Sequence, residues 1–198
     1  MALRESMLQK DVLYVVKTCG AYGTLAFLFS IIGIFHPDAF IVGNPLEVSN
    51  LSAEHVLGHI GFGLIVGIAS FSLRYFAIAG LFPIILDADH LIQFFDIEMI
   101  PRMAHSVTFG ILAAVLMIVI FGRKDARLAA IAFASVLSHI SFDVILGGGS
   151  VFPLVVPFSA ETFWFVGFEG ILIQVLAIVI VALAFLLDKK REWIKVST

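Results

Sequence analysis

Hydrophobic residues gather in six long runs, separated by short segments rich in polar residues, glycine and proline. Each run is close to the roughly 20 apolar residues that a helix needs to cross a bilayer. The pattern predicts an all-α, polytopic integral membrane protein with about six transmembrane helices, forming a single domain over residues 1–198. The predicted spans cover residues 14–35, 53–72, 75–95, 104–121, 126–146 and 162–187.

Composition supports this fold class and disfavours several others. Of the 198 residues, 61% are hydrophobic and 14% are charged, whereas a soluble domain is about 45–50% apolar and roughly 25% charged. Soluble enzymes and disordered linkers are therefore disfavoured. The net charge of −3 is too close to balance for a polyanion partner, so we expect membrane lipids rather than nucleic acid around the chain. The single cysteine, Cys19, leaves no internal disulfide.

Lysine and arginine residues predict the orientation. With six spans, both termini lie on one side of the membrane, and only Arg102 among the basic residues falls on the other side. Cytoplasmic segments are enriched in these residues, so both termini are predicted to be cytoplasmic, in the inner membrane of a prokaryote. Residues 36–52, 96–103 and 147–161 then face outward. The basic residues on the cytoplasmic side are Arg4, Lys10, Lys17, Arg74, Arg123, Lys124, Arg127, Lys189, Lys190, Arg191 and Lys195.

The histidine, aspartate and glutamate residues in the predicted spans all lie near the outward ends of those spans. Such residues are expensive at membrane depth and mark a functional site by default. The spacing of two pairs, His55 with His59 and His139 with Asp143, places each pair on one helix face. Histidine nitrogen and carboxylate oxygen without thiolate suit Zn²⁺, or Mn²⁺ and Fe²⁺. The candidate metal ligands are His55, His59, Asp87, His90, His105, His139 and Asp143, for one to three ions.

Each of these features also has a simpler interpretation. Two histidines at this spacing are often packed or interfacial side chains. A histidine and an aspartate one turn apart can serve only as a hydrogen bond between helices. The segment 87–90 can be a solvated helix end, and Glu161 and Glu169 can be interfacial or paired residues. The convergence of all these groups on one leaflet is what favours a metal site.

Four short motifs, in order, resemble those of the YdjM-like membrane-bound metal-dependent hydrolase family. Residues 86–90 resemble its "PDxDH" motif, residues 104–106 the end of "HRGxTHS", and residues 137–143 its "SHxxxD" segment. Residues 147–158 are similar to its "GGxxLLWPF" ending, and Gly58-His59 matches an early family histidine. The resemblance covers about residues 54–160. The sequence departs from these motifs at several positions. Leu86 replaces the proline of the first motif, Ile100 and Pro101 replace the histidine and arginine that open the second, with an arginine displaced by one to Arg102, and Ala104 replaces its threonine.

That family is in turn similar to the zinc-dependent phospholipase C and single-strand nuclease superfamily, whose helical members cleave phosphate esters. By this resemblance a first metal would be held by Asp87 or Asp89 with His105, His139 and Asp143. His59 would help to hold a second metal, with Asp143 between the two.

The resemblance and the polar cluster together predict a membrane-embedded metal-dependent hydrolase that acts on a phosphate ester of a lipid headgroup. Asp89, Arg102 and Ser106 are the candidate catalytic residues, with Arg102 placed to hold a phosphate oxygen and Ser106 to donate a hydrogen bond or to cap a helix. An intramembrane metalloprotease is disfavoured because Val56 replaces the glutamate of H-E-x-x-H. A metal transporter, a haem protein and a partner-binding scaffold remain alternatives.

Overall fold

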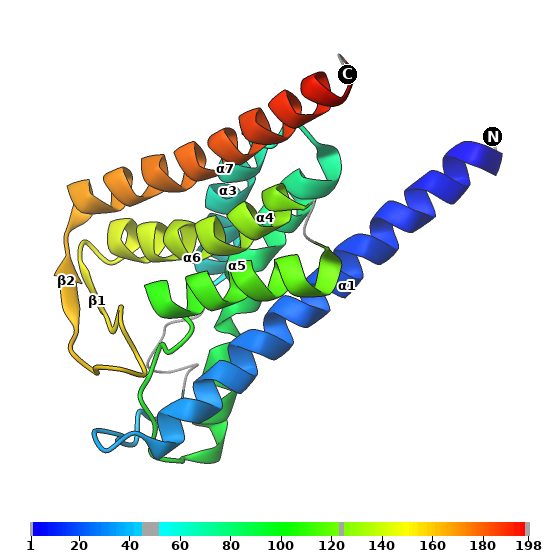
Figure 1. The fold of residues 1–198 in the computed structure, drawn as a ribbon. Helices are drawn as coiled ribbons and strands as arrows, with labels where there is room; N and C mark the ends of the chain where they lie inside the picture. The colour runs from blue at the N-terminus through cyan, green and yellow to red at the C-terminus, as the bar shows by residue number, and fades with distance from the viewer. Residues whose placement is uncertain (1, 45–51, 123–124, 197–198) are drawn as a thin grey trace.

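The computed structural model describes residues 2–44, 52–122 and 125–196, and it is mainly helical (Figure 1). Among the positions outside these ranges are Arg123, Lys124 and residues 45–51 of the first predicted outward loop. The elements, in order, are α1 (Ala2–Ile32), η1 (Gly33–Phe35), α3 (Ala53–Ile68), α4 (Leu73–Leu86), η2 (Asp87–Phe95), α5 (Val107–Phe121), α6 (Ala126–Leu146), β1 (Ser150–Phe152), β2 (Phe163–Phe165) and α7 (Gly167–Val196).

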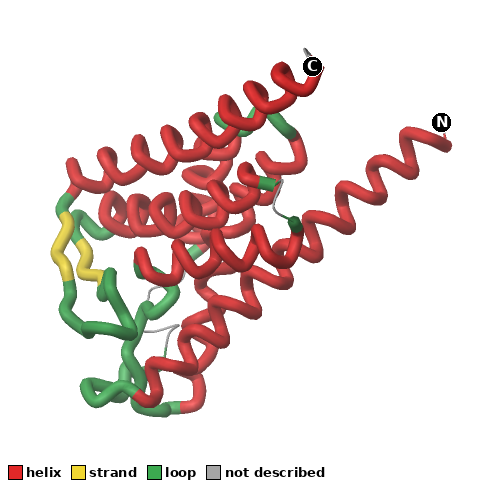
Figure 2. Tube along the Cα trace, viewed as in Figure 1, coloured by secondary structure: helices red, strands yellow, loops and turns green. Residues whose placement is uncertain are grey.

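Helix α6 is the centre of the bundle. Every residue from Ala134 to Val144 is buried, and α6 packs against α3, α4, α5 and α7. Helix α1 crosses the outside of the bundle against α4, α5 and η2. The start of α1 and the end of α7 lie at the same end of the molecule (Figure 1), which we call the terminal end. The loops around β1 and β2 lie at the other end (Figure 2), which we call the hairpin end.

Four helical segments are long and apolar enough to cross a membrane, rather than the six predicted. They are Met7–Phe35, Leu73–Phe95, Ala126–Leu146 and Gly167–Lys190. The other two predicted spans form apolar helices of only 16 and 15 residues, α3 and α5. Helix α3 stops at Ile68 and is followed by Phe71 in a left-handed conformation (φ 50°). Helix α5 begins only after Ser106, so both fall below the length of an ordinary span.

The prediction of helix for the start of the sixth span is wrong. Residues Phe163–Phe165 form strand β2, which pairs antiparallel with β1, and α7 begins at Gly167. Each strand has only three residues, too few to show the alternation of apolar and polar side chains that marks a strand. The aromatic residues of β2 therefore look like the start of the apolar run that forms α7. The side chain of Glu169 accepts a hydrogen bond from the Val166 amide (2.8 Å) and caps the start of α7.

Helices α3 and α4 approach closely because Gly63 has no side chain and Pro83 has no backbone N–H. Pro83 has no N–H to donate to the carbonyl of Ala79, the acceptor one turn earlier. Gly63 of α3 lies against that carbonyl, so that a Cβ at Gly63 would be 2.1 Å from the Ala79 oxygen. Any larger residue at position 63 would therefore separate the two helices.

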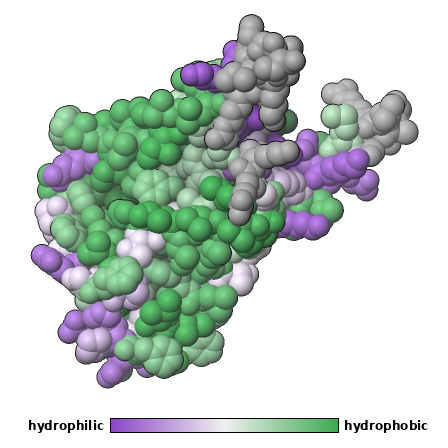
Figure 3. Space-filling model, in the orientation of Figure 1, coloured by the Kyte–Doolittle hydropathy of each residue, from purple (hydrophilic) through white to green (hydrophobic). Residues whose placement is uncertain are grey.

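Apolar side chains cover the middle of the visible face, and polar residues gather near its two ends (Figure 3).

At the terminal end, Asp125 links three helices. It accepts hydrogen bonds from the hydroxyls of Tyr14 on α1 and Tyr75 on α4 (2.6 Å for Tyr75), and it caps α6 by accepting from the Leu128 amide. Arg74 stacks over the rings of both tyrosines. Polar contacts between α1, α4 and α6 therefore stabilise the terminal end of the bundle.

Candidate metal centre

Five of the six histidines converge with three aspartates at the hairpin end of the bundle. All seven predicted metal ligands are among them, together with Asp89. Four overlapping groups within the cluster have nitrogen and oxygen atoms within 4.8 Å of one another, a spacing compatible with metal binding. The side chains come from the first two turns of α3, from η2, from the segment before α5 and from the last turns of α6. No residue of this cluster is exposed.

The first group joins η2 to the segment before α5. His90 Nε2 lies 3.5 Å from an oxygen of Asp87 and 3.6 Å from Oδ1 of Asp89. His105 lies between the same two carboxylates, with Nε2 3.5 Å from Asp87 and Nδ1 3.1 Å from Asp89. The amide of Ala104 donates to Asp89 (3.2 Å), which fixes that carboxylate against the chain that carries His105.

The second group joins α3 to α6. His55 and His59 face each other one turn apart, with their Nε2 atoms 3.1 Å apart. Asp143 reaches across from α6 and places Oδ1 3.2 Å from His59 Nε2. Phe142, the neighbour of Asp143, packs its ring on Gly58, where a Cβ would lie 1.8 Å from Phe142 Cζ. The glycine therefore allows α3 to bring its histidines up to α6.

His139 connects the two groups. Its Nε2 lies 3.4 Å from Asp87 Oδ1 and 3.5 Å from Asp143 Oδ2. Its Nδ1 lies 2.7 Å from the carbonyl oxygen of Pro83. A carbonyl can only accept, so Nδ1 carries the proton and the lone pair of Nε2 faces the carboxylates. This is the tautomer that a metal ligand requires.

A change of helix type makes this arrangement possible. At Asp87 the chain passes from α-helix to a 3-10 helix, and the Asp87 amide donates to Ile84. The carbonyl of Pro83 is thereby released from the α-helical partner four residues on and becomes available to His139. The 3-10 helix also places Asp87 and His90 on one edge, since residues three apart are eclipsed in it. Asp87 and Asp89 are two residues apart, so in a regular α-helix their side chains would not share a face.

The donor set fits a divalent cation. Nε2 of His139, Oδ1 of Asp89 and Nδ1 of His59 are buried and have no hydrogen-bond partner among the described residues. Of these atoms, His139 Nε2 faces the carboxylates of Asp87 and Asp143. Unpaired polar atoms and three buried carboxylates are costly without a compensating positive charge. An ion bound between them would supply that charge and use histidine and carboxylate ligands together.

Without such an ion, a proton can supply part of the charge. His105 precedes α5 and is 1% exposed. Burial lowers the pKa of His105, but the charge of Asp89 and the hydrogen bonds to Asp87 and Asp89 outweigh burial and raise the pKa to about 9. The carboxylates around His105 thus favour a cation at this position.

Two of the three predicted catalytic residues lie outside the cluster. Ser106 caps α5, one of its two predicted roles: its hydroxyl accepts from the Phe109 amide (3.1 Å) and donates to the Met103 carbonyl (2.8 Å). Arg102 lies near the cluster, with its guanidinium over the ring of Phe152. Asp89, the third, is within the first ligand group.

Sequence reasoning missed two neighbours of the cluster. Gln93 is 3% exposed, and its amide lies 2.9 Å from Nδ1 of His90; its place one 3-10 turn after His90 becomes apparent only once the helix type is known. Phe152 of β1 stacks on the His105 ring, with 6.2 Å between centroids, and nothing in the sequence indicates that contact.

Comparisons with known proteins give no relative for this chain. No family model, no curated protein and no solved structure matches it. The functional argument therefore rests on the geometry of the cluster.

Proposed function

We propose that the chain is a membrane-embedded metal-dependent hydrolase that cleaves a phosphate ester of a lipid headgroup at the outward face of the membrane. The observation that carries this proposal is a pair of buried ligand atoms without a hydrogen-bond partner among the described residues, Nε2 of His139 and Oδ1 of Asp89, inside a cluster contributed by four separate segments. A structural role alone would need fewer ionisable groups, each with its own partner.

The residues divide into two sets of candidate ligands with one residue, His139, between them. Asp87, His90 and His105 would hold one ion, while His55, His59 and Asp143 would hold another. Zn²⁺ suits this donor set best, and Mn²⁺ or Fe²⁺ are the alternatives. When bound, the metal supplies a Lewis acid that polarises the phosphate ester and makes water a stronger nucleophile near neutral pH.

The chain's own side chains would orient this chemistry. Pro83 holds His139 in the tautomer with Nε2 available, and Ala104 holds one oxygen of Asp89. The second oxygen of Asp89 has no hydrogen-bond partner among the described residues and lies 3.6 Å from His90 Nε2; we assign it the role of general base toward water. The apolar helices around the cluster limit the access of bulk water.

The decisive experiment is the metal content of the detergent-purified full chain, measured by elemental mass spectrometry. We expect at least one stoichiometric transition metal in the wild type, and its loss in Asp143→Asn and His139→Ala. His36→Ala is the matched control, because His36 is the one histidine outside the cluster. If the wild type takes up no metal after incubation with Zn²⁺ or Mn²⁺, the proposal fails.

Activity is tested next with a chromogenic phosphate diester and with phospholipid vesicles. The wild type should hydrolyse at least one of these substrates, and Asp143→Asn should abolish turnover while expression is retained. A protein that binds metal but hydrolyses neither class would be a non-catalytic metal-binding membrane protein, the alternative left by the sequence.

A further inference from the structure

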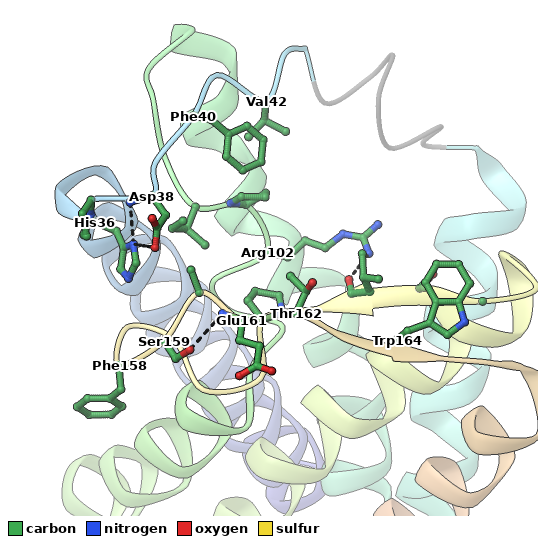
Figure 4. A pocket seen from close by; sticks show the side chains of 18 residues that line it. His36, Asp38, Phe40, Val42, Arg102, Phe158, Ser159, Glu161, Thr162 and Trp164 are labelled. Atoms are coloured by element: carbon green, nitrogen blue, oxygen red, sulfur yellow. Dashed lines mark hydrogen bonds and ion pairs between the residues drawn. The ribbon is translucent and has the colours of Figure 1, made fainter.

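A cavity of about 1000 Å³ lies at the hairpin end, beside the cluster (Figure 4). Its walls come from three segments far apart in the sequence: residues 36–42 after α1, residues 100–102 before α5, and residues 149–164 around the two strands. This volume is at the upper end of the range for ligand pockets, roughly 300–1,000 Å³. It is therefore large enough for more than a phosphate group.

The walls of the cavity are mainly apolar. Phe40, Val42, Ile100, Val151 and Trp164 are among the lining residues. Trp164 is 65% exposed and Phe40 51%, so the cavity has an aromatic rim at the surface. Aromatic side chains of this kind are enriched where a membrane protein meets the interface between lipid and water.

Arg102 is the permanent cation among the described residues that line the cavity. One guanidinium nitrogen donates to the Val151 carbonyl (3.3 Å), and the group lies over the ring of Phe152 at 5.2 Å. No carboxylate of the described part of the chain lies within 4.0 Å of it. Most of its five N–H donors are therefore available for the oxygens of an anion.

The backbone of Arg102 is held in an unfavourable conformation. Its φ is 56°, in the left-handed region that non-glycine residues rarely adopt. The Arg102 carbonyl accepts from the His105 amide (3.0 Å), so this turn sets the position of the arginine relative to a metal ligand. Strained residues of this kind concentrate where ligands bind.

The acidic residues that line the cavity do not neutralise Arg102. Asp38 is paired with His36, at 3.6 Å between Oδ2 and Nδ1. Glu161 is exposed and has no ion pair among the described residues. Figure 4 shows Glu161 and Asp38 at positions apart from the Arg102 guanidinium.

The cavity is connected to the cluster by one side chain. Phe152 is fully buried, and its ring contacts both the Arg102 guanidinium and the His105 imidazole. A phosphate on Arg102 would therefore lie one aromatic ring away from a candidate metal ligand, with the apolar walls available to the rest of the molecule.

We propose that this cavity is the binding site for a phosphate-bearing amphiphile, with the phosphate on Arg102 and an apolar chain against the cavity walls. The inference rests on the proposed function for the identity of the substrate. It adds where that lipid binds: its phosphate on Arg102 and its apolar chain in the cavity, outside the cluster of candidate metal ligands.

Binding to the detergent-purified full chain is measured by native mass spectrometry with three probes. They are dihexanoyl phosphatidic acid, which has phosphate and chains, dihexanoylglycerol, which has chains only, and glycerol 3-phosphate, which has phosphate only. We expect the phosphatidic acid to bind at least about tenfold more tightly than either of the others. Arg102→Gln should weaken this binding by about tenfold or more, since it removes a charge-assisted contact.

Two further variants test whether binding depends on the charge of Arg102 in particular and on the free volume of the cavity. Lys17→Gln removes the same charge from an exposed position on α1, and should leave binding unchanged. Thr162→Trp adds bulk at an exposed position in the cavity wall and should weaken binding of the phosphatidic acid. Metal content should remain at the wild-type level in all three variants.

Equal binding of glycerol 3-phosphate and phosphatidic acid would overturn the proposal, as would unchanged binding in Arg102→Gln. Failure of this proposal can be distinguished from failure of the proposed function. If the wild type hydrolyses a phosphate ester while Arg102→Gln and Thr162→Trp bind the lipid normally, the cavity assignment is wrong and the hydrolase stands. If lipid binding depends on Arg102 but the protein holds no metal, the cavity assignment stands and the hydrolase fails.

Discussion

The side-chain amide of Gln93 lies 2.9 Å from Nδ1 of His90, and both residues are buried. The amide oxygen of Gln93 otherwise has no partner. The atom nearest Nδ1 is the amide nitrogen Nε2, a donor. A half-turn of the amide, which exchanges its nitrogen and oxygen, would let Oε1 accept from Nδ1–H and leave the lone pair of His90 Nε2 facing Asp87 and Asp89. Gln93 then orients His90 as Pro83 orients His139, so two histidines of the cluster are held by groups outside it.

Gln93→Leu tests this positioning role. The variant should lower metal affinity by about 10–100-fold, as is usual when a group that orients a metal ligand is removed. The measurement is competition with a chelating indicator dye. Gln174→Leu is the control, since Gln174 is also buried but bonds the Phe62 carbonyl. Equal metal affinity in the two variants would show that Gln93 does not position His90.

Gly58→Ala tests the approach of α3 to α6. The added Cβ collides with the ring of Phe142, so α3 must move and His59 must withdraw from Asp143. We expect a lower thermal unfolding midpoint and loss of part of the bound metal. Gly61→Ala lies on the same helix with open space around it, and should be neutral or more stable by about 0.5–1 kcal/mol. Similar metal content in both proteins would contradict the prediction.

Ser106→Ala separates capping from catalysis. Removal of the cap of α5 should cost about 0.5–2 kcal/mol of stability, measured by chemical unfolding in detergent. Metal content and turnover per folded molecule should stay at the wild-type level, because both hydrogen-bonding functions of the hydroxyl are used locally. A fall in turnover of tenfold or more without loss of stability would restore the catalytic role.

Asp125→Ala tests whether the hydrogen bonds of Asp125 stabilise the terminal end of the bundle. The substitution leaves Tyr14 and Tyr75 without their shared acceptor and uncaps α6, so stability should fall by more than about 2 kcal/mol. Metal content should be unchanged, because the cluster lies at the other end. Asp11→Ala is the control: its contact with Arg74 is exposed and long, at 3.5 Å, and such pairs contribute little. A comparable loss in both variants would argue against the network.

Much of the cluster could be predicted from the sequence because its members fall on helices with regular spacing. His55 with His59, and His139 with Asp143, follow directly from the 3.6-residue period, and a topology with consecutive antiparallel helices brings their ends together. All seven predicted ligands meet in the structure. The metal, its number of ions and the hydrolase activity remain predictions.

Other features depend on backbone geometry that side-chain pattern does not encode. The 3-10 segment after Leu86 gives Asp87 its place, but its apolar residues are as compatible with α-helix. The short strands are hidden in an apolar aromatic run. The cavity is built from loops whose approach depends on tertiary packing. For that reason the sequence does not indicate that His36, in the first outward loop, lines the cavity with a side chain that is 12% exposed.

The shortness of α3 and α5 has a consequence for the surrounding bilayer. At 1.5 Å per residue, helices of 16 and 15 residues are about 24 Å and 22 Å long, whereas the hydrocarbon core is about 30 Å thick. If both cross the membrane as proposed, the mismatch draws the lipid leaflets together beside them. The thinned region borders the first turn of α3, where His55 lies. Neighbouring lipids would then have their phosphates at the depth of the candidate metal centre, and the protein would not need to extract a lipid from the bilayer.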